Sequence, residues 1–213
     1  MKNKEIEEKE VRTIKTESRI EEREDGKYLI GHAAVFNVEA VINTRYGSFR
    51  ELVEPGAFRE AIAQDDIRAL FNHNEDIVLG RNRSGTLKIW EDETGLAYEV
   101  NLPETQGAKD LKISVGRGDV SQGSFSFNAR GERREVWERS KSGGLDLRRI
   151  INAKLMDIGP VTFPAYEKTD VAVRSHQEWR KQIDGPEEKS AFELVVEPDS
   201  LMSLRRHFLN RRL

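Results

Sequence analysis

Short runs in which apolar and polar side chains alternate occur along most of the chain, and they restrict its fold more than any other feature. The clearest pair of runs, residues 85–90 and 96–102, flanks the sequence Asp92-Glu93-Thr94-Gly95. Two alternating runs joined by an Asp/Gly turn are typical of a β-hairpin. We therefore expect a chain built mainly from short, half-buried strands. Further runs predict strands at residues 28–36, 67–71, 120–128, 133–137 and 145–163.

Two segments have the spacing of an amphipathic helix instead. The apolar residues Phe58, Ala61 and Ile62 fall three and four positions apart, which predicts a short helix. A second helix is expected to follow Thr105, which would serve as its N-cap. Many short strands with a few helices predict an α+β fold that is mainly β, with a small β-barrel or curled sheet surrounded by helices.

Charged residues make up 34% of the 213 residues, which is high for a compact fold, so we expect the excess in solvated extensions. The first 25 residues hold nine acidic and seven basic side chains, and regular structure is expected to begin at Lys27. The sequence becomes polar again after Arg174. These changes predict a charged N-terminal extension (1–26), a main domain (27–174) and a polar C-terminal extension (175–213).

Residues 201–213 form a basic amphipathic segment. Leu201, Leu204 and Phe208 share one helix face, and four arginines occur without an acidic residue. A terminal helix packed on the main domain, a helix that docks on a partner protein, and a segment that binds a membrane surface or nucleic acid all fit this pattern.

The composition excludes several kinds of chemistry. The chain has no cysteine, so it cannot form a disulfide, use a thiolate nucleophile or bind a metal through Cys. A net charge of −3 argues against bulk nucleic-acid binding. The N-terminus lacks the apolar region of a secretory signal, and the apolar runs are far shorter than the ~20 residues of a membrane span. We expect a soluble, intracellular protein.

Two serines lie in an unusual alternation, Gly123-Ser124-Phe125-Ser126-Phe127. In a strand, Ser124 and Ser126 point to one face and the two phenylalanines point to the other. The aromatic side chains would anchor the strand in the core and hold the hydroxyls on an accessible side. The same pattern also fits an ordinary strand with a polar outer face, which is the commoner case.

A serine nucleophile needs a base with a pKa near neutrality and a group that orients that base. His73 follows an apolar alternating run, and His32, in a tightly packed strand, is the competing candidate. His176 and His207 lie in the C-terminal extension. Asp157 is flanked by apolar residues, and a buried carboxylate needs a partner. From the residues alone, His73 also fits a half-buried structural histidine, and Asp157 a carboxylate that caps a turn.

Eight motifs, in order and with similar spacing between Gly31 and Arg174, resemble the prohead maturation proteases of tailed bacteriophages. Each motif is short, but eight in sequence are hard to obtain by chance. They are Glu54-Pro55-Gly56-Ala57-Phe58, Leu70-Phe71-Asn72-His73, Leu79-Gly80-Arg81 with Ser84-Gly85-Thr86-Leu87, Glu91-Asp92-Glu93-Thr94-Gly95-Leu96, Asn101-Leu102-Pro103-Glu104-Thr105, Arg117-Gly118-Asp119-Val120, Gly123-Ser124-Phe125-Ser126-Phe127 and Val161-Thr162-Phe163-Pro164-Ala165-Tyr166.

The resemblance implies a serine endopeptidase with a fold similar to the herpesvirus assemblin proteases, a small β-barrel surrounded by helices. Such proteases act in the host cytoplasm inside the immature capsid (the prohead), where they remove a scaffold segment from the major capsid protein and cut themselves. By motif, the nucleophile is Ser124, the base is His73 and the third member is Asp157. The sequence does not identify the donors that stabilise the oxyanion; a backbone N–H near Ser124 and the side chain of Arg130 are the candidates. We expect no cofactor, metal, membrane or nucleic acid, and analogy with the assemblins suggests a homodimer.

The chain departs from the family's usual motifs at three positions. Ser126 shares the face of Ser124 and is therefore a second candidate nucleophile. Asn74 stands where an Asp is common after the histidine. Gly159 replaces a frequent Ser near Asp157, which puts in question how this carboxylate is held.

Two other functions remain open from the sequence. One is a non-enzymatic capsid assembly protein that keeps the protease fold and binds the scaffold segment. The other is a β-barrel binding module unrelated to proteolysis. The joint presence of Ser124 and His73 in matching motifs favours the enzyme, because a pure binding module needs neither side chain.

Overall fold

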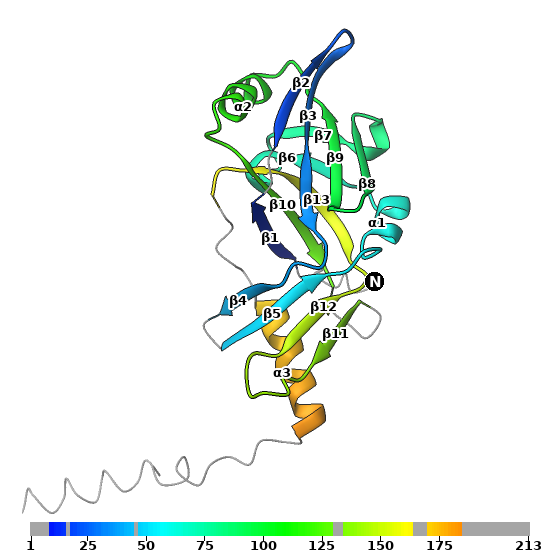
Figure 1. Ribbon diagram of the computed structural model, residues 1–213. Helices are drawn as coiled ribbons and strands as arrows, with labels where there is room; N and C mark the ends of the chain where they lie inside the picture. Colours follow the sequence, from blue (N-terminus) through cyan, green and yellow to red (C-terminus); the bar gives the residue numbers. More distant parts are fainter. Residues whose placement is uncertain (1–8, 16–17, 45–46, 130–133, 164–169, 185–213) are drawn as a thin grey trace, which may run out of the picture. The chain divides into compact units, whose positions relative to one another are not determined.

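The computed structural model describes residues 9–15, 18–44, 47–129, 134–163 and 170–184 (Figure 1). The chain divides into two compact units, of which the first ends at His176. Arg130, His207 and the basic segment 201–213 lie outside the described residues, so the roles expected for them stay predictions.

The described strands form three sheets (Figure 1). Over these residues none of the sheets closes into a barrel. The mainly β, α+β fold is therefore confirmed, whereas the barrel is not. The five-stranded sheet has the order β1 (Glu10–Lys15), β10 (Gln122–Asn128), β13 (Lys154–Val161), β6 (Arg68–Leu70) and β7 (Val78–Arg81). One four-stranded sheet has the order β11 (Glu135–Glu138), β12 (Leu147–Ile150), β5 (Gly47–Val53) and β4 (Ala40–Thr44). The other has the order β2 (Arg19–Arg23), β3 (Gly26–Val35), β9 (Gly95–Asn101) and β8 (Leu87–Glu91).

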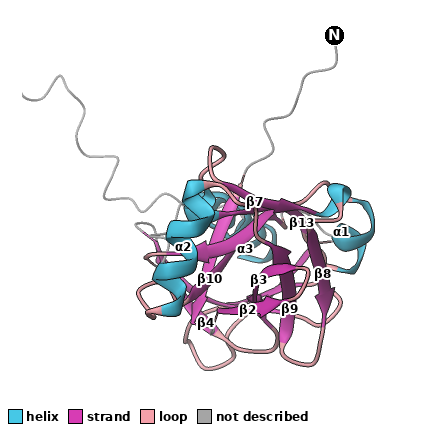
Figure 2. Cartoon of the chain, turned by 90° about the horizontal axis from the view of Figure 1, so that it is seen from above, coloured by secondary structure: helices cyan, strands magenta, loops and turns pink. Residues whose placement is uncertain are grey.

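Both helices expected within the main domain are present, and they lie on opposite sides of the strands (Figure 2). Thr105 holds the N-cap position of α2 in an extended conformation, but its side chain makes no capping hydrogen bond. The described helical segments are α1 (Arg59–Gln64), α2 (Gln106–Gly116), α3 (Asp170–Asp184) and the single 3-10 turns η1 (Phe71–His73) and η2 (Asn82–Ser84).

The predicted strands are confirmed in most places and wrong in two. Strands β8 and β9 pair as the expected antiparallel hairpin. The run 145–163 is not one strand, because the chain turns at residues 151–153 and its two halves, β12 and β13, join different sheets. In the run 67–71 the strand ends at Leu70, and η1 begins at Phe71.

Among the residues that the structure describes, regular structure is already present at Glu10, well before the expected start at Lys27. Strand β1 pairs antiparallel with β10, and β2 pairs antiparallel with β3. Glu10 and Arg12 are buried, contrary to the expectation of a solvated segment. Each is paired with an opposite charge from another strand, Arg12 with Glu51 of β5 and Glu10 with Arg148 of β12, which offsets the cost of burying them.

The core lies beneath the strand that carries the two serines. Phe125 and Phe127 of β10 are buried and stack on each other, with ring centroids 4.9 Å apart. Phe58, just before α1, meets Phe125 edge-on at 5.5 Å. As the alternation predicts, this aromatic cluster anchors β10 and fixes the opposite face, where Ser124 and Ser126 lie.

Candidate active site

The register between β10 and β13 decides which side chains meet. Ser124 lies opposite Gly159, and Ser126 lies opposite Asp157. The register then shifts, so that Phe127 faces Leu155. Such β-bulges bend a strand and re-aim its side chains, and they are common next to active sites. Here the carboxylate of Asp157 reaches the face of β10 that carries both serines.

His73 lies in a tight turn that is tied to β13. Asn72 and His73 both have a φ of 55°, in the left-handed region that non-glycine residues enter at a cost. The Asn72 side-chain amide donates to Thr162 Oγ1 at 3.1 Å, and the Thr162 N–H donates to Asn72 Oδ1 at 2.8 Å. These two hydrogen bonds hold the turn carrying His73 against the end of the strand carrying Asp157. Asn72 and Thr162 both occur in the motifs of the sequence, but no local pattern indicates that they form a pair.

The structure brings Ser124, His73 and Asp157 together. His73 Nε2 lies 2.7 Å from Ser124 Oγ, and His73 Nδ1 contacts Asp157 Oδ1. Ser126 does not join this line. Its hydroxyl donates to Asp157 Oδ2 and accepts a hydrogen bond from the Asp157 N–H at 3.2 Å. Lys9 Nζ donates to the same Oδ2 at 2.8 Å, a partner that the sequence did not reveal.

The hydrogen bonds to Asp157 keep it ionised. Burial alone would raise the pKa of this carboxyl, but hydrogen bonds from His73, Lys9 and Ser126 lower its pKa to about 2. An ionised carboxylate only accepts hydrogen bonds, so the hydrogen at this contact belongs to His73 Nδ1. In the neutral imidazole, Nε2 is then an acceptor facing the Ser124 hydroxyl, which is the tautomer that a general base requires.

Ser124 is completely buried, so the expectation of an accessible hydroxyl face was wrong. The cause is β1, which covers the edge of β10. Ser124 Oγ lies 2.7 Å from the main-chain carbonyl oxygen of Arg12, and Thr13 Oγ1 lies 3.4 Å from Ser124 Oγ. Arg12 and Thr13 were missed because the charged N-terminal segment was expected to be solvated.

Steric contact with the backbone of Leu70 explains why position 159 is a glycine. Its φ of +155° is one that side chains rarely adopt, and a Cβ there would lie 2.0 Å from the carbonyl oxygen of Leu70. Leu70 immediately precedes the turn that carries His73. The absence of a side chain at Gly159 therefore lets β13 approach this turn closely.

The remaining candidate residues have other partners. His32 Nε2 lies 2.8 Å from Asp92 Oδ2, and His176 Nε2 lies 2.7 Å from Asp146 Oδ2. Asn74 Oδ1 accepts a hydrogen bond from the N–H of the residue two positions later, as in an Asx turn.

Neither a metal cluster nor a membrane span was found in the part of the chain that the structure describes. Within it, no three His, Asp or Glu side chains are grouped so that they could hold a metal ion. No helix among these residues is long and apolar enough to cross a bilayer.

Comparison with known proteins gives one match. The sequence model of the caudovirus prohead serine protease family matches residues 14–182, which is most of the chain. No curated protein and no solved structure matches significantly. The family is one of serine peptidases and implies a protease of capsid maturation. The chain therefore belongs to the caudovirus prohead serine protease family.

Proposed function

We propose that this chain is the serine endopeptidase of capsid maturation, with Ser124 as nucleophile, His73 as general base and Asp157 as the group that orients the base. The observation that carries the proposal is the unbroken line of contacts from Ser124 Oγ through His73 to Asp157. These three side chains come from β10, η1 and β13, and a binding module has no need to assemble them. Ser126 is a positioning residue for Asp157.

The reaction follows from these contacts. His73 Nε2 removes the hydroxyl proton as Ser124 Oγ attacks the peptide carbonyl carbon. The imidazolium then gives this proton to the leaving amine, which breaks the C–N bond and leaves an acyl-enzyme. A water molecule, deprotonated by His73 in the same way, hydrolyses the ester. The ionised Asp157 offsets the positive charge on His73 in both steps.

Membership of the family supports a proposal for the substrates of this chemistry and for the place where it occurs. The proposed substrates are the scaffold segment of the major capsid protein and the protease chain itself, inside the prohead in the host cytoplasm. A homodimer and an assemblin-like barrel also belong to this proposal, by analogy with the assemblins. Because β1 and β2 pair with strands of the first compact unit, we propose that residues from Glu10 onward work as part of the protease.

The experiment is co-expression of the chain with its major capsid protein. We expect Ser124→Ala to abolish both shortening of the capsid protein and self-trimming, measured by mass spectrometry of the products. The matched control is Ser126→Ala, two residues away on the same strand face, which should slow cleavage through the lost hydrogen bond to Asp157 but not abolish it. Cleavage that persists in Ser124→Ala would refute the assignment. Absence of cleavage in the unmodified chain would favour a non-enzymatic assembly protein.

A further inference from the structure

The arrangement around Ser124 leaves no place for a substrate. The Ser124 side chain is completely buried, and its Oγ already contacts His73, Arg12 and Thr13. Attack on a peptide requires the substrate carbonyl carbon to come within about 3–3.5 Å of Oγ. Some neighbour of β10 therefore has to move before the proposed reaction can take place.

The neighbour that can move is β1. Strand β13 is interior to its sheet, paired with β10 on one side and β6 on the other, and it carries Asp157. Strand β1 is the terminal strand of the same sheet and pairs there with β10. Figure 1 shows β1 at this edge, beside β10. Removing β1 would uncover Ser124 and leave the backbone groups of β10 free to pair with another extended chain.

In its present position β1 competes with the base for the serine proton. The carbonyl oxygen of Arg12 and Nε2 of His73 both lie 2.7 Å from Ser124 Oγ, and the hydroxyl has one hydrogen to donate. The Arg12 carbonyl accepts that hydrogen through its oxygen, so its carbon is not presented for attack. Strand β1 thus occupies the place of a substrate in a geometry that does not react.

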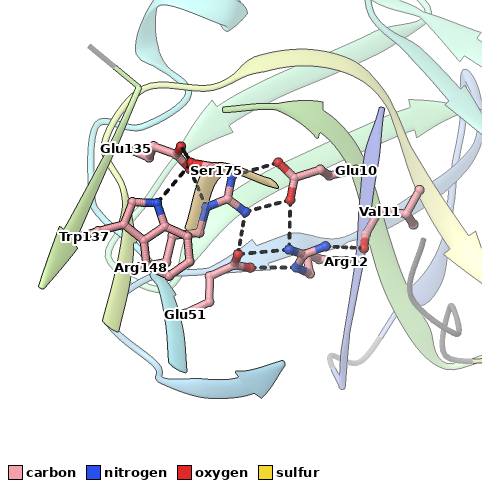
Figure 3. Close-up of polar contacts among 8 residues, drawn as sticks. All are labelled: Glu10, Val11, Arg12, Glu51, Glu135, Trp137, Arg148 and Ser175. Atoms are coloured by element: carbon pink, nitrogen blue, oxygen red, sulfur yellow. Dashed lines mark hydrogen bonds and ion pairs between the residues drawn. The ribbon is translucent and has the colours of Figure 1, made fainter. Parts of the chain in front are cut away.

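The inward face of β1 is held by a buried cluster of charges, which Figure 3 shows. Arg12 Nε lies 2.6 Å from Glu51 Oε1, and Arg148 Nη1 lies 2.6 Å from Glu10 Oε2. Arg148 also pairs with Glu51 and Glu135. Since β1 supplies one acid and one base, its departure leaves a single arginine facing two carboxylates. An incoming chain with a basic side chain in the place of Arg12 would neutralise the excess negative charge.

A pocket of about 460 Å³ runs beside β1. It is lined by residues 11–15 of β1, by Phe125, by Glu51 and by apolar residues of β3, β4, β5 and the β3–β4 loop, among them the exposed Val38 and Val41. The pocket therefore leaves room for a strand whose side chains are larger than those of β1.

We propose that the edge of β10 now covered by β1 is the binding site for an extended substrate segment with a basic side chain in the place of Arg12. Strand β1 is the internal occupant of this site and is displaced when a substrate adds to β10. This inference rests on the proposed function. The inference adds to the proposed function the place at which the substrate binds and the way in which it binds.

Because the chain has no cysteine, a disulfide can pin β1 in place and be released at will. Lys15 and Gln122 are Cα partners at the end of the β1–β10 pair, and the double variant Lys15→Cys/Gln122→Cys joins them. We expect cleavage of the capsid protein to be at least tenfold slower in the oxidised form than after reduction. The matched control, Asn43→Cys/Ser48→Cys, joins β4 to β5 and should cleave equally in both states. Equal rates in the oxidised and reduced forms of the β1–β10 variant would overturn the inference.

Peptide binding tests the same idea without catalysis. A fluorescein-labelled peptide with the sequence of residues 9–15 should bind the Ser124→Ala, Lys15→Cys, Gln122→Cys chain at least tenfold more tightly after reduction than before, measured by anisotropy. A peptide with Glu in place of the arginine should bind more weakly. Failure of the reduced chain to bind, or equal binding in both states, counts against the site. If the unmodified chain shows no cleavage that depends on Ser124, the proposed function itself is refuted rather than the binding site.

Discussion

At the scale of single residues, the burial of Asp157 can be predicted from its neighbours in the sequence, whereas its hydrogen-bond partners are seen only in the tertiary structure. The apolar neighbours of Asp157 predict its burial, which the structure confirms. The pattern does not predict the number of its partners, because His73, Lys9 and Ser126 come from three separate segments of the chain. Those partners, rather than burial, decide that the carboxyl is ionised.

This ionisation predicts a pH dependence of stability. The folded pKa of about 2 lies below the ordinary value of 3.8, so the ionised group stabilises the fold above pH 3.8 and the effect is lost as the pH falls toward 2. The shift corresponds to about 2 kcal/mol, of which roughly half is lost by pH 3.

We therefore expect the free energy of unfolding of the unmodified chain to exceed that of Asp157→Asn most at pH 6, and by less at pH 3. Urea titrations at both pH values measure this difference in the free energy of unfolding, and a difference that does not change with pH would contradict the prediction.

The same variant, Asp157→Asn, should reduce turnover at pH 7 by roughly 10³–10⁴-fold, because Asn no longer holds the correct tautomer of His73.

At the scale of elements, β12 shows where periodicity misleads. A charged residue next to another charged residue is expected to face solvent, yet Arg148 is completely buried while its neighbour Arg149 is only partly buried. Burial would lower the pKa of Arg148, but Glu10, Glu51 and Glu135 hold it well above its ordinary value. Strand β12 therefore joins two other strands and β1 through charge, which alternation cannot reveal.

The two adjacent arginines make a matched pair of variants. Arg148→Met leaves three buried carboxylates without this partner, and we expect it to lower the free energy of unfolding by about 3–5 kcal/mol. Arg149→Met removes ion pairs to Glu54 and Glu138 that are 40% exposed on the arginine side, and should cost less than about 1 kcal/mol. Urea unfolding of both variants checks the prediction, and equal losses would show that the buried cluster is not what stabilises β12.

At the scale of the whole molecule, the first compact unit extends past the boundary at Arg174. Trp137 Nε1 donates to Ser175 Oγ at 3.1 Å, and the His176 ring stacks on Trp137 with centroids 4.6 Å apart. The family match also continues to residue 182. The division into domains at 27 and 174 stays a prediction, and we propose that its C-terminal boundary lies at the end of α3.

We propose that the polar C-terminal extension (175–213) directs the protease into the assembling prohead, and truncation separates this targeting role from folding. A chain ending at Asp184 should keep the urea midpoint and the cleavage rate of the full chain but enter proheads less, if residues 185–213 direct packaging. A chain ending at Arg174 should unfold at lower urea, because Trp137 loses its hydrogen bond to Ser175 and Asp146 loses its contact with His176. Gel analysis of purified proheads measures packaging. Equal packaging of the chain ending at Asp184 would contradict a targeting role.

The sequence by itself determined the elements with a strong local period: the β8–β9 hairpin, helices α1 and α2, and the shared face of Ser124 and Ser126 on β10. Its motifs also pointed to His73 and Asp157, which the structure brings to Ser124. Only the tertiary structure decided that the charged residues Glu10 and Arg12 of β1 are buried, that β1 covers the nucleophile, and that the register of β10 and β13 places Asp157 opposite Ser126. The physical reason is that periodicity reports how polar a side chain is, whereas burial of a charge depends on partners that lie far away in the chain.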